Sequence, residues 1–318
     1  MRQFSVSRLE IWPAERFVIV LSLAALAVNL VQVFWRDIEV DWAGYSVTVG
    51  VALATFAAGQ FYRLSGRSER IGAALTGTAL LVFFTMAISA FNYLLMPITR
   101  PSIDPALVRF DALFGYHWPD MIVLAAEYPV LSEVLRYAYI STMPQIAFLL
   151  IVLGLTGRVR DLHDLIAFVA ITATIAIVFW GFFPSHGASS QFTLPADLEQ
   201  AVNPVLGTAY GQELVRLAAE GPGRLAPDEI RGLIGFPSYH TVLALIAVYA
   251  ARSLKWVFPV FLLINILIIP ATLMQGGHHL ADIPAGFVLF FIGLWITRKT
   301  VDQHYETSGR PELLAKET

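Results

Sequence analysis

The sequence predicts an all-α fold, a polytopic membrane helix bundle with about eight transmembrane helices. First, 57% of the 318 residues are hydrophobic and only 14% are charged, whereas about 25% of the residues in an ordinary soluble domain carry a charge. Second, several apolar runs reach about 20 residues, the length that a helix needs to cross about 30 Å of hydrocarbon. Third, the positive charges fall on alternate connections between these runs.

Helices are the expected spanning elements, because a helix satisfies its backbone hydrogen bonds within one segment. The expected spans lie near residues 17–35, 43–62, 71–96, 132–155, 162–183, 239–254, 256–275 and 280–298. A shorter apolar stretch at 121–126 is expected to be a tilted or interfacial helix. The first run is too long for the core of a cleaved signal peptide and is interpreted as a retained membrane helix.

Arginine and lysine predict the orientation of the bundle. They cluster before the first span and after the second, fourth, sixth and last, at Arg2, Arg8, Arg16, Arg63, Arg67, Arg70, Arg158, Arg160, Arg252, Lys255, Arg298 and Lys299. The positive-inside rule makes these connections cytoplasmic, together with both termini. The loops 97–131 and 184–236 and the turn 275–279 then face the opposite side. His163 falls on the cytoplasmic side without a partner motif, and we expect it to be solvated.

Composition narrows the chemistry. The chain contains no cysteine, which excludes a disulfide framework, a thiolate nucleophile and a thiolate metal site. The net charge of −3 gives no sign of a nucleic-acid partner, and none is expected. The expected partners are membrane lipids.

One candidate motif opens the sixth span, in the segment Gly235–Thr241 (GFPSYHT). Pro237 suits the first turn of a helix, where its missing N–H costs nothing. The free N–H groups of such a terminus and the Ser238 hydroxyl can form an anion site. His240 beside that site could donate a proton to a leaving oxygen.

A second candidate motif opens the last span, where His278 precedes Asp282 by four residues. That spacing puts both side chains on one helical face. The carboxylate can hold one ring nitrogen and leave the other as a nucleophile or ligand. Either motif alone is commonly an interfacial side chain, but two on one predicted membrane face favour chemistry. His279 lies off the Asp282 face and is expected to be structural.

These residues resemble a known family. Pro237–Thr241 followed by Gly277–Asp282 resembles the second and third signatures of the type-2 phosphatidate phosphatase superfamily, and more closely its inositol phosphorylceramide synthase-like branch. The segment 104–115 is similar to one that precedes the catalytic half of that branch. The resemblance covers about residues 90–300. It implies two additional N-terminal helices at 1–70 and a six-helix phosphatase-like catalytic core at 71–300, with active-site loops at 97–131 and 184–236. The charge pattern makes the remaining segment, 301–318, a cytoplasmic tail.

The resemblance implies a covalent mechanism on a lipid phosphate. His278 would attack phosphorus to form a phosphohistidine, Asp282 would orient it, and His240 would protonate the departing alcohol. Water, a lipid or another alcohol would accept the phosphoryl group. The scheme implies no metal and no other cofactor.

The sequence departs from the superfamily where phosphate-binding basic residues are expected. In place of the first signature, a Lys followed by Arg-Pro, the chain has Phe183–Gly187, and Thr272 occupies the usual arginine position before the third. The synthase-like branch commonly lacks these residues as well. Substrate-binding candidates are therefore Ser238, Tyr239, His186, Arg136 and Arg100. His186 and Arg136 could equally be structural.

Two other function classes remain open. Intramembrane ionisable residues also mark transporters and channels, although no pair of broken half-helices in two repeats is visible. A zinc enzyme could use His278, His279, Asp282 and His240 as ligands. The sequence does not distinguish ceramide, diacylglycerol, polyprenyl diphosphate or a phosphosugar headgroup as substrate, or hydrolysis from transfer.

Overall fold

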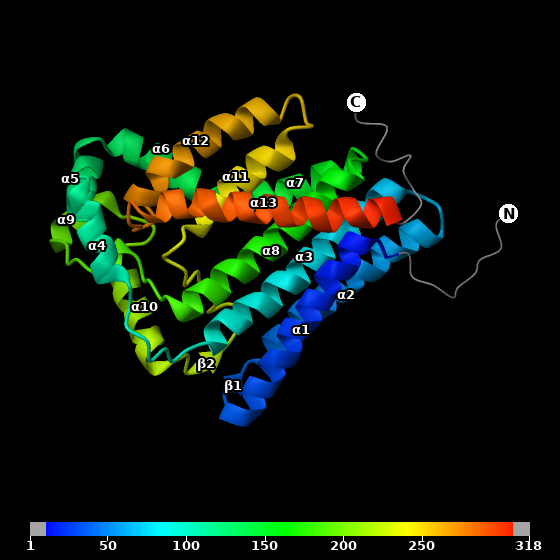
Figure 1. Ribbon diagram of the computed structural model, residues 1–318, viewed down its shortest axis with the longest axis horizontal. Coiled ribbons are helices and arrows are strands. Elements are labelled where there is room, and N and C mark those ends of the chain that lie inside the picture. The colour runs from blue at the N-terminus through cyan, green and yellow to red at the C-terminus, as the bar shows by residue number, and fades with distance from the viewer. Residues whose placement is uncertain (1–10, 308–318) are drawn as a thin grey trace.

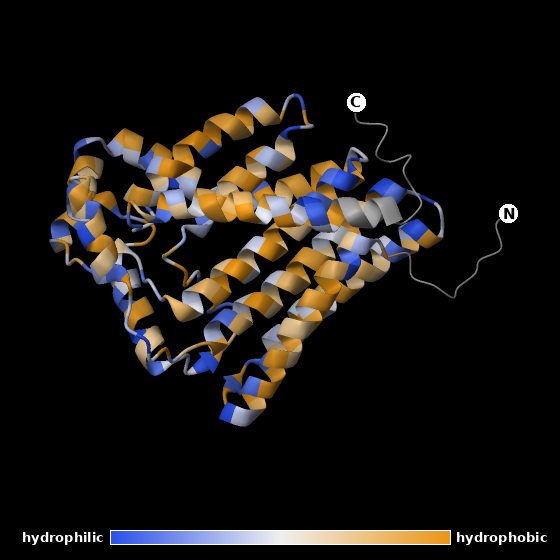
Figure 2. Ribbon diagram, in the orientation of Figure 1, coloured by the Kyte–Doolittle hydropathy of each residue, from blue (hydrophilic) through white to orange (hydrophobic). Residues whose placement is uncertain are grey.

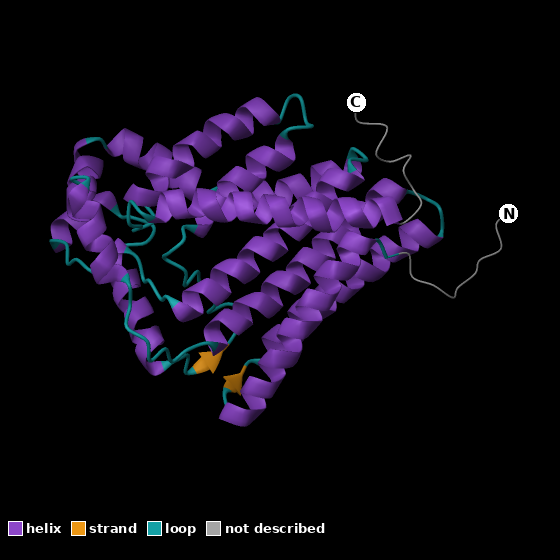
Figure 3. Cartoon of the chain, viewed as in Figure 1, coloured by secondary structure: helices purple, strands orange, loops and turns teal. Residues whose placement is uncertain are grey.

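The computed structural model describes residues 11–307, and this part of the chain is almost entirely helical, as predicted (Figure 1, Figure 3). The helices are α1 (Pro13–Arg36), α2 (Trp42–Leu64), α3 (Glu69–Leu94), α4 (Asp104–Leu113), α5 (Trp118–Glu127), α6 (Pro129–Ile140), α7 (Thr142–Leu155), α8 (Val159–Phe182), the 3₁₀ turn η1 (Ala188–Ser190), α9 (Ala196–Val202), α10 (Thr208–Glu220), α11 (Tyr239–Ala251), α12 (Phe258–Met274) and α13 (Asp282–Thr307). Two short strands, β1 (Glu39–Val40) and β2 (Arg224–Leu225), pair in parallel. This pairing ties the α1–α2 connection to the long loop 184–236.

Helices α3 and α8 form the centre of the bundle. Of the residues in their apolar windows 61% and 67% are buried, against 22% in α1 and 11% in α2. The core contains Phe84 of α3, Leu149 of α7 and Phe168 of α8, all of them fully buried. The outer faces carry exposed apolar side chains, such as Val47 and Val51 of α2, and the helices are apolar over most of their length (Figure 2). Such surfaces are suited to lipid rather than water.

Each of the eight predicted spans corresponds to a helix or a helix pair, but not all are long enough to cross a membrane. Helices α1, α2, α3, α8 and α13 qualify by length and composition, and α6 with α7, bent by 45°, makes a sixth. Helices α11 and α12 have 13 and 17 residues. At about 1.5 Å per residue they rise about 20 and 26 Å, less than about 30 Å of hydrocarbon. By length and composition, the described part of the chain therefore contains five or six candidate spans, against the predicted eight.

The loops that carry the candidate motifs gather at one end of the bundle. Helices α8 and α12 end there, α11 and α13 begin there, and α4, α5, α9 and α10 cover it (left in Figure 1). The predicted interfacial helix at 121–126 is α5. The first turn of α1 and the last turn of α13 lie at the opposite end.

A buried ion triad joins α1, α2 and α8 at that opposite end. The guanidinium of Arg63 donates to both carboxylate oxygens of Glu15, at 2.5 and 2.8 Å. His163 Nε2 lies 3.3 Å from Glu15 Oε1, and all three side chains are almost fully buried. The prediction that His163 is solvated is therefore wrong. Its partner Glu15 comes 148 residues earlier in the chain, a separation at which sequence spacing gives no signal.

Parts of two sequence predictions lie outside the described residues. These are the arginines at positions 2 and 8, which support the predicted cytoplasmic N-terminus, and the tail from residue 308 onward. The predicted division at residue 70 stays a prediction. In the structure α1 packs against α3, α8 and α13, so the first helices share one packed bundle with the rest of the chain.

Candidate active site

His278 and Asp282 form a buried hydrogen-bonded pair where α13 begins. His278 Nδ1 lies 2.7 Å from Asp282 Oδ2, and the two side chains are 4% and 0% exposed. The same carboxylate oxygen accepts the backbone N–H of His279 at 2.9 Å. Asp282 is the first residue of α13, where the helix dipole favours a negative charge. An anionic partner on Nδ1 fixes the imidazole and leaves Nε2 for chemistry.

His240 lies in the first turn of α11, which begins at Tyr239. Ser238 caps this helix, because its Oγ accepts the backbone N–H of Thr241 at 3.3 Å and the Thr241 hydroxyl at 3.1 Å. With its oxygen accepting, Ser238 still has its own hydroxyl proton to donate. The sequence predicts Pro237 in the first turn of this helix, but in the structure Pro237 precedes the capping residue Ser238 and lies outside the helix.

The two motifs meet in space. Ser238 N donates to the Asp282 carbonyl at 3.1 Å, and the His240 and His278 rings meet edge to face with centroids 6.4 Å apart. Tyr139 of α6 stacks on the His240 ring at 4.1 Å, with its hydroxyl 3.2 Å from His240 Nδ1. When this hydroxyl donates to Nδ1, the ring proton of a neutral His240 resides on Nε2. Sequence patterns gave no indication of Tyr139.

The loop after α8 packs against the turn 276–281, called the His278 turn below. Ser189 N donates to the Gly277 carbonyl at 3.2 Å. Gly187 has a left-handed φ of 81°, and a Cβ there would lie 2.7 Å from the Gly277 carbonyl oxygen. Glycine at position 187 is therefore required for the close approach of the two segments. It brings the segment that replaces the missing basic signature next to the His278 turn.

His186 in this loop forms a second histidine–carboxylate contact. Its Nδ1 lies 3.3 Å from Asp104 Oδ2, and its side chain is 9% exposed. The backbone N–H of His186 donates to the same oxygen at 2.8 Å. Among the described residues, His186 Nε2 has no hydrogen-bond partner. His186 thus presents a buried ring nitrogen beside the His278 turn.

His279 belongs to a cluster that the sequence predictions missed. Its Nδ1 lies 2.7 Å from Asp111 Oδ2, and its Nε2 lies 3.4 Å from Asp104 Oδ1, a distance at which the contact is chiefly electrostatic. Burial lowers the pKa of His279, but the contacts with Asp104 and Asp111 outweigh it and raise the pKa to about 9. Asp104 and Asp111, seven residues apart on the buried face of α4, were the available signal, since that spacing repeats on one helical face.

The other predicted substrate contacts point elsewhere. The Tyr239 hydroxyl donates to the Val169 carbonyl of α8 at 3.1 Å. Arg136 donates to the Asn203 carbonyl, and Arg100 is exposed and donates to the Gly181 carbonyl. Within the described part of the chain, neither guanidinium pairs with the histidines or carboxylates around His278.

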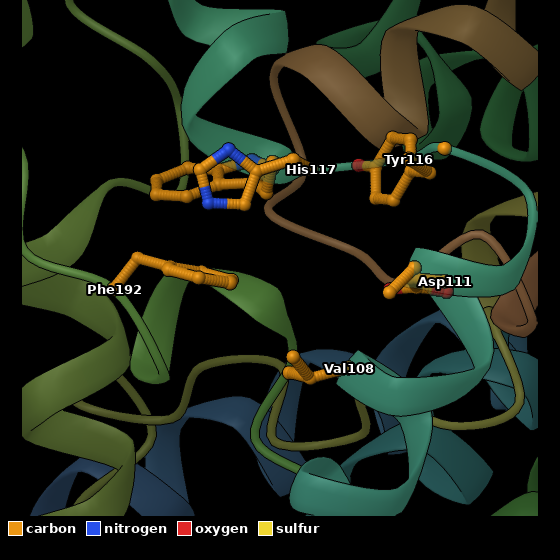
Figure 4. Close-up of a pocket in the computed structure, with 8 residues that line it drawn as sticks. Val108, Asp111, Tyr116, His117 and Phe192 are labelled. Atoms are coloured by element: carbon orange, nitrogen blue, oxygen red, sulfur yellow. The ribbon is translucent and has the colours of Figure 1, made fainter.

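A pocket of about 290 Å³ opens beside the His278 turn. In Figure 4, Asp111 and Tyr116 lie on one side of it, and His117 and Phe192 lie on the other. The Tyr116 hydroxyl donates to the His278 carbonyl at 2.9 Å. One wall of this largely apolar pocket therefore touches the backbone of the His278 turn.

Together these residues provide a nucleophile paired with a carboxylate, a second histidine beside it and hydrogen-bond donors for an anion. In residues 11–301 no group of three or more His, Asp or Glu side chains has the arrangement of a metal site. Of the four residues proposed as zinc ligands, His278 pairs with Asp282, the His279 ring contacts Asp111 and His240 contacts Tyr139.

Comparison with known proteins gives one match. A family model described as the PAP2 superfamily matches residues 105–296. The matched range runs from α4 into α13 and contains His240, His278 and Asp282. No curated protein and no solved structure matches the chain.

Proposed function

The chain belongs to the PAP2 superfamily, whose members are phosphatases, and we propose that it is a membrane-embedded lipid-phosphate phosphotransferase or phosphatase that works through a phosphohistidine. Family membership and the apolar helices support an integral membrane enzyme acting on phosphate esters. The lipid substrate, the covalent intermediate and the kinship with inositol phosphorylceramide synthases are the proposed refinements.

The observation that carries this proposal is the buried His278–Asp282 pair, with the His240 ring 6.4 Å from the His278 ring. In the first step the lone pair of His278 Nε2 attacks phosphorus. The N–P bond forms as the bond to the lipid oxygen breaks, and His240, entering this step as an imidazolium, gives a proton to that oxygen and becomes neutral. Asp282 stabilises the positive charge that develops on the His278 ring.

The second step regenerates the enzyme. His240, now the base, takes the proton of water or of an acceptor alcohol as its oxygen attacks phosphorus. The N–P bond breaks, and the product is inorganic phosphate or a new phosphate ester. Ser238 and His186 are proposed to donate hydrogen bonds to the phosphate oxygens in both steps.

Surface chemistry supports a lipid substrate. Leu113 and Phe114 at the end of α4 are 81% and 66% exposed, and Val130 at the start of α6 is 78% exposed. These side chains flank the covered end of the bundle that holds the His278 turn. A lipid could keep its chains against such a surface while its phosphate reaches the polar site.

The direct test uses purified protein in lipid nanodiscs and a panel of radiolabelled lipid phosphates, with and without acceptor alcohols. Wild type should form an acid-labile, alkali-stable phosphoenzyme, and vanadate should inhibit it. His278→Ala should abolish the phosphoenzyme. His163→Asn, which removes a buried histidine from the opposite end of the bundle, should not. Full activity of folded His278→Ala protein would refute the mechanism.

We further propose that both termini are cytoplasmic and that the site faces the periplasm, lumen or exterior. Because the chain has no cysteine, a single introduced cysteine reports sidedness with an impermeant thiol reagent. Asp197→Cys, on α9, should be labelled from outside intact cells. Lys255→Cys, on the α11–α12 connection, should be labelled only after the membrane is opened. The reverse pattern would overturn the orientation.

A further inference from the structure

A second histidine–carboxylate network lies directly beside the His278–Asp282 pair, and the transfer steps leave most of it without a role. It consists of Asp104 and Asp111 on α4, His186 in the loop after α8, and His279 in the His278 turn. All four side chains are nine-tenths buried or more. Placing so many ionisable groups out of water is costly unless their charges compensate one another.

His279 is the positive centre of this network. Each of its three N–H positions faces a carboxylate, with the backbone N–H on Asp282, Nδ1 on Asp111 and Nε2 toward Asp104. Besides these anions, the ionisable groups near it are His278, its chain neighbour, and His186, which reaches it only through Asp104. The contacts with Asp104 and Asp111 overcome the opposing effect of burial and raise the pKa of His279 to about 9. It is therefore an imidazolium near neutral pH.

Asp104 is the anion that links the two histidines. Burial raises its pKa, but hydrogen bonds and contacts from His186, His279, Ser102 and Ser185 outweigh burial and hold the pKa well below its usual range. Ser185 Oγ donates to Oδ1 at 2.5 Å, and Ser102 also donates to this carboxylate. Asp104 thus stays charged while fully buried.

Asp111 fixes the His278 turn. Its two oxygens accept from His279 Nδ1 at 2.7 Å and from the backbone N–H of Leu280 at 3.0 Å. One carboxylate therefore holds the two residues that directly follow His278 in the chain. Because Asp104, Leu107 and Asp111 share the buried face of α4, a single rigid helix carries both anions.

The geometry of the network also bears on phosphate binding. The contact of His186 Nδ1 with Asp104 leaves His186 Nε2 buried and without a hydrogen-bond partner among the described residues. When it carries a proton, this ring nitrogen can donate to a phosphate oxygen. The His186–Asp104 pair resembles the His278–Asp282 pair, in which a carboxylate also contacts Nδ1 and leaves Nε2 free.

We propose that Asp104 and Asp111, acting through His186 and His279, are positioning residues that hold the His278 turn and a buried positive charge in place for an incoming phosphate. This inference rests on the proposed function. In this proposal the network supplies positive charge near the phosphate, which is the role of the basic side chains that are absent from Phe183–Gly187. The ligand is a phosphate or a phosphate mimic, and the network acts on it through His186 and His278.

The test measures orthovanadate binding to the full chain in nanodiscs as a function of pH, together with thermal unfolding. His279→Asn keeps an N–H donor for Asp111 but removes the ring charge, and Asp111→Asn removes the anion. His163→Asn is the matched control, because it removes an equally buried imidazole from the opposite end of the bundle. The ionisation of vanadate itself is the same for every protein and cancels in the ratio of dissociation constants.

Near neutral pH, His279→Asn and Asp111→Asn should weaken vanadate binding by about tenfold or more, as the loss of a partner that orients a ligating histidine commonly does. The ratio of His279→Asn to wild type should return toward one as pH rises through about 9, because wild type then loses the same charge. A purely structural role would shift unfolding but not this pH-dependent ratio. His163→Asn should bind vanadate like wild type at every pH.

The outcomes separate the two proposals. Folded His279→Asn and Asp111→Asn proteins that bind vanadate as wild type does would overturn this inference and leave the proposed function standing. A wild type that neither binds vanadate nor forms a phosphoenzyme would overturn the proposed function, and this inference with it. If neither variant folds, Ser185→Ala decides, because it removes only one donor to Asp104. Unchanged vanadate binding in that variant would overturn the inference.

Discussion

Replacing Asp282 by asparagine removes a charge from the candidate site while preserving its hydrogen bonds. Asp282 Oδ2 accepts from both His278 Nδ1 and His279 N, whereas Oδ1 has no hydrogen-bond partner among the described residues. An asparagine with its carbonyl oxygen at the Oδ2 position keeps both acceptor contacts and puts its NH₂ where Oδ1 lies. The side chain is fully buried but nearly identical in shape, so Asp282→Asn should fold.

The expected loss is in kcat. When phosphorus bonds to Nε2, the His278 ring becomes positively charged next to the Asp282 carboxylate. Two unit charges about 4 Å apart attract by about 4 kcal/mol at an effective dielectric constant of about 20. Since each factor of ten in rate corresponds to about 1.4 kcal/mol, loss of the carboxylate charge should lower kcat by about 10³-fold.

The assay is the single-turnover rate of phosphoenzyme formation, with thermal unfolding as the measure of folding. Asp120→Asn is the matched control, because it makes the same change in a more exposed pair, His117 with Asp120 at 3.1 Å, and should leave the rate unchanged. Folded Asp282→Asn protein with a rate within about tenfold of wild type, a difference of about 1.4 kcal/mol, would show that the Asp282 charge does not stabilise the transition state.

Three further predictions concern other contacts. Tyr139→Phe keeps the stacked ring on His240 but loses one hydrogen bond. Its kcat should fall by about 2- to 12-fold, the equivalent of about 0.5–1.5 kcal/mol. An unchanged kcat would show that the Tyr139 hydroxyl does not contribute to catalysis. Glu15→Gln leaves the Arg63 guanidinium buried without its anion and should cost about 3–5 kcal/mol in unfolding free energy, with kcat of the folded protein unchanged. The folded-state pKa of His279 is raised from 6.5 to about 9. The extra unfolding free energy of wild type over His279→Asn that comes from this charge should therefore be full below pH 6.5 and lost above about pH 9. A difference that grows with pH would contradict a positively charged His279.

Much of the fold follows from local sequence. Apolar runs placed every one of the eight helices or helix pairs of the bundle, because a helix in hydrocarbon must carry its own apolar surface. Their true lengths were harder to predict. The run 256–275 contains a helix of only 17 residues, α12 (Phe258–Met274), since apolar residues at 256 and 257 belong to the preceding turn. Apolarity alone does not mark where a helix ends.

In the candidate site, too, some contacts join residues that are near in sequence and others join residues that are far apart. His278 and Asp282 are four residues apart and do meet, but α13 begins only at Asp282 and His278 lies in the turn before it. The prediction of a shared helical face is therefore wrong, and the turn 276–281 makes the contact. Tyr139 meets His240 across 101 residues, and Asp111 meets His279 across 168. No periodic pattern connects residues so distant, and only the packing of α4 and α6 over the site brings them to it.

The sequence by itself therefore determined that this protein is a helical membrane bundle and that histidines lie at or just before the starts of two of its helices, because hydrophobic runs are local properties of the chain. The tertiary structure decided which groups surround those histidines. It placed His279 between Asp104 and Asp111 and buried His163 against Glu15. Burial and charge compensation arise from segments far apart in the sequence, and these determine whether a histidine is solvated, structural or available for chemistry.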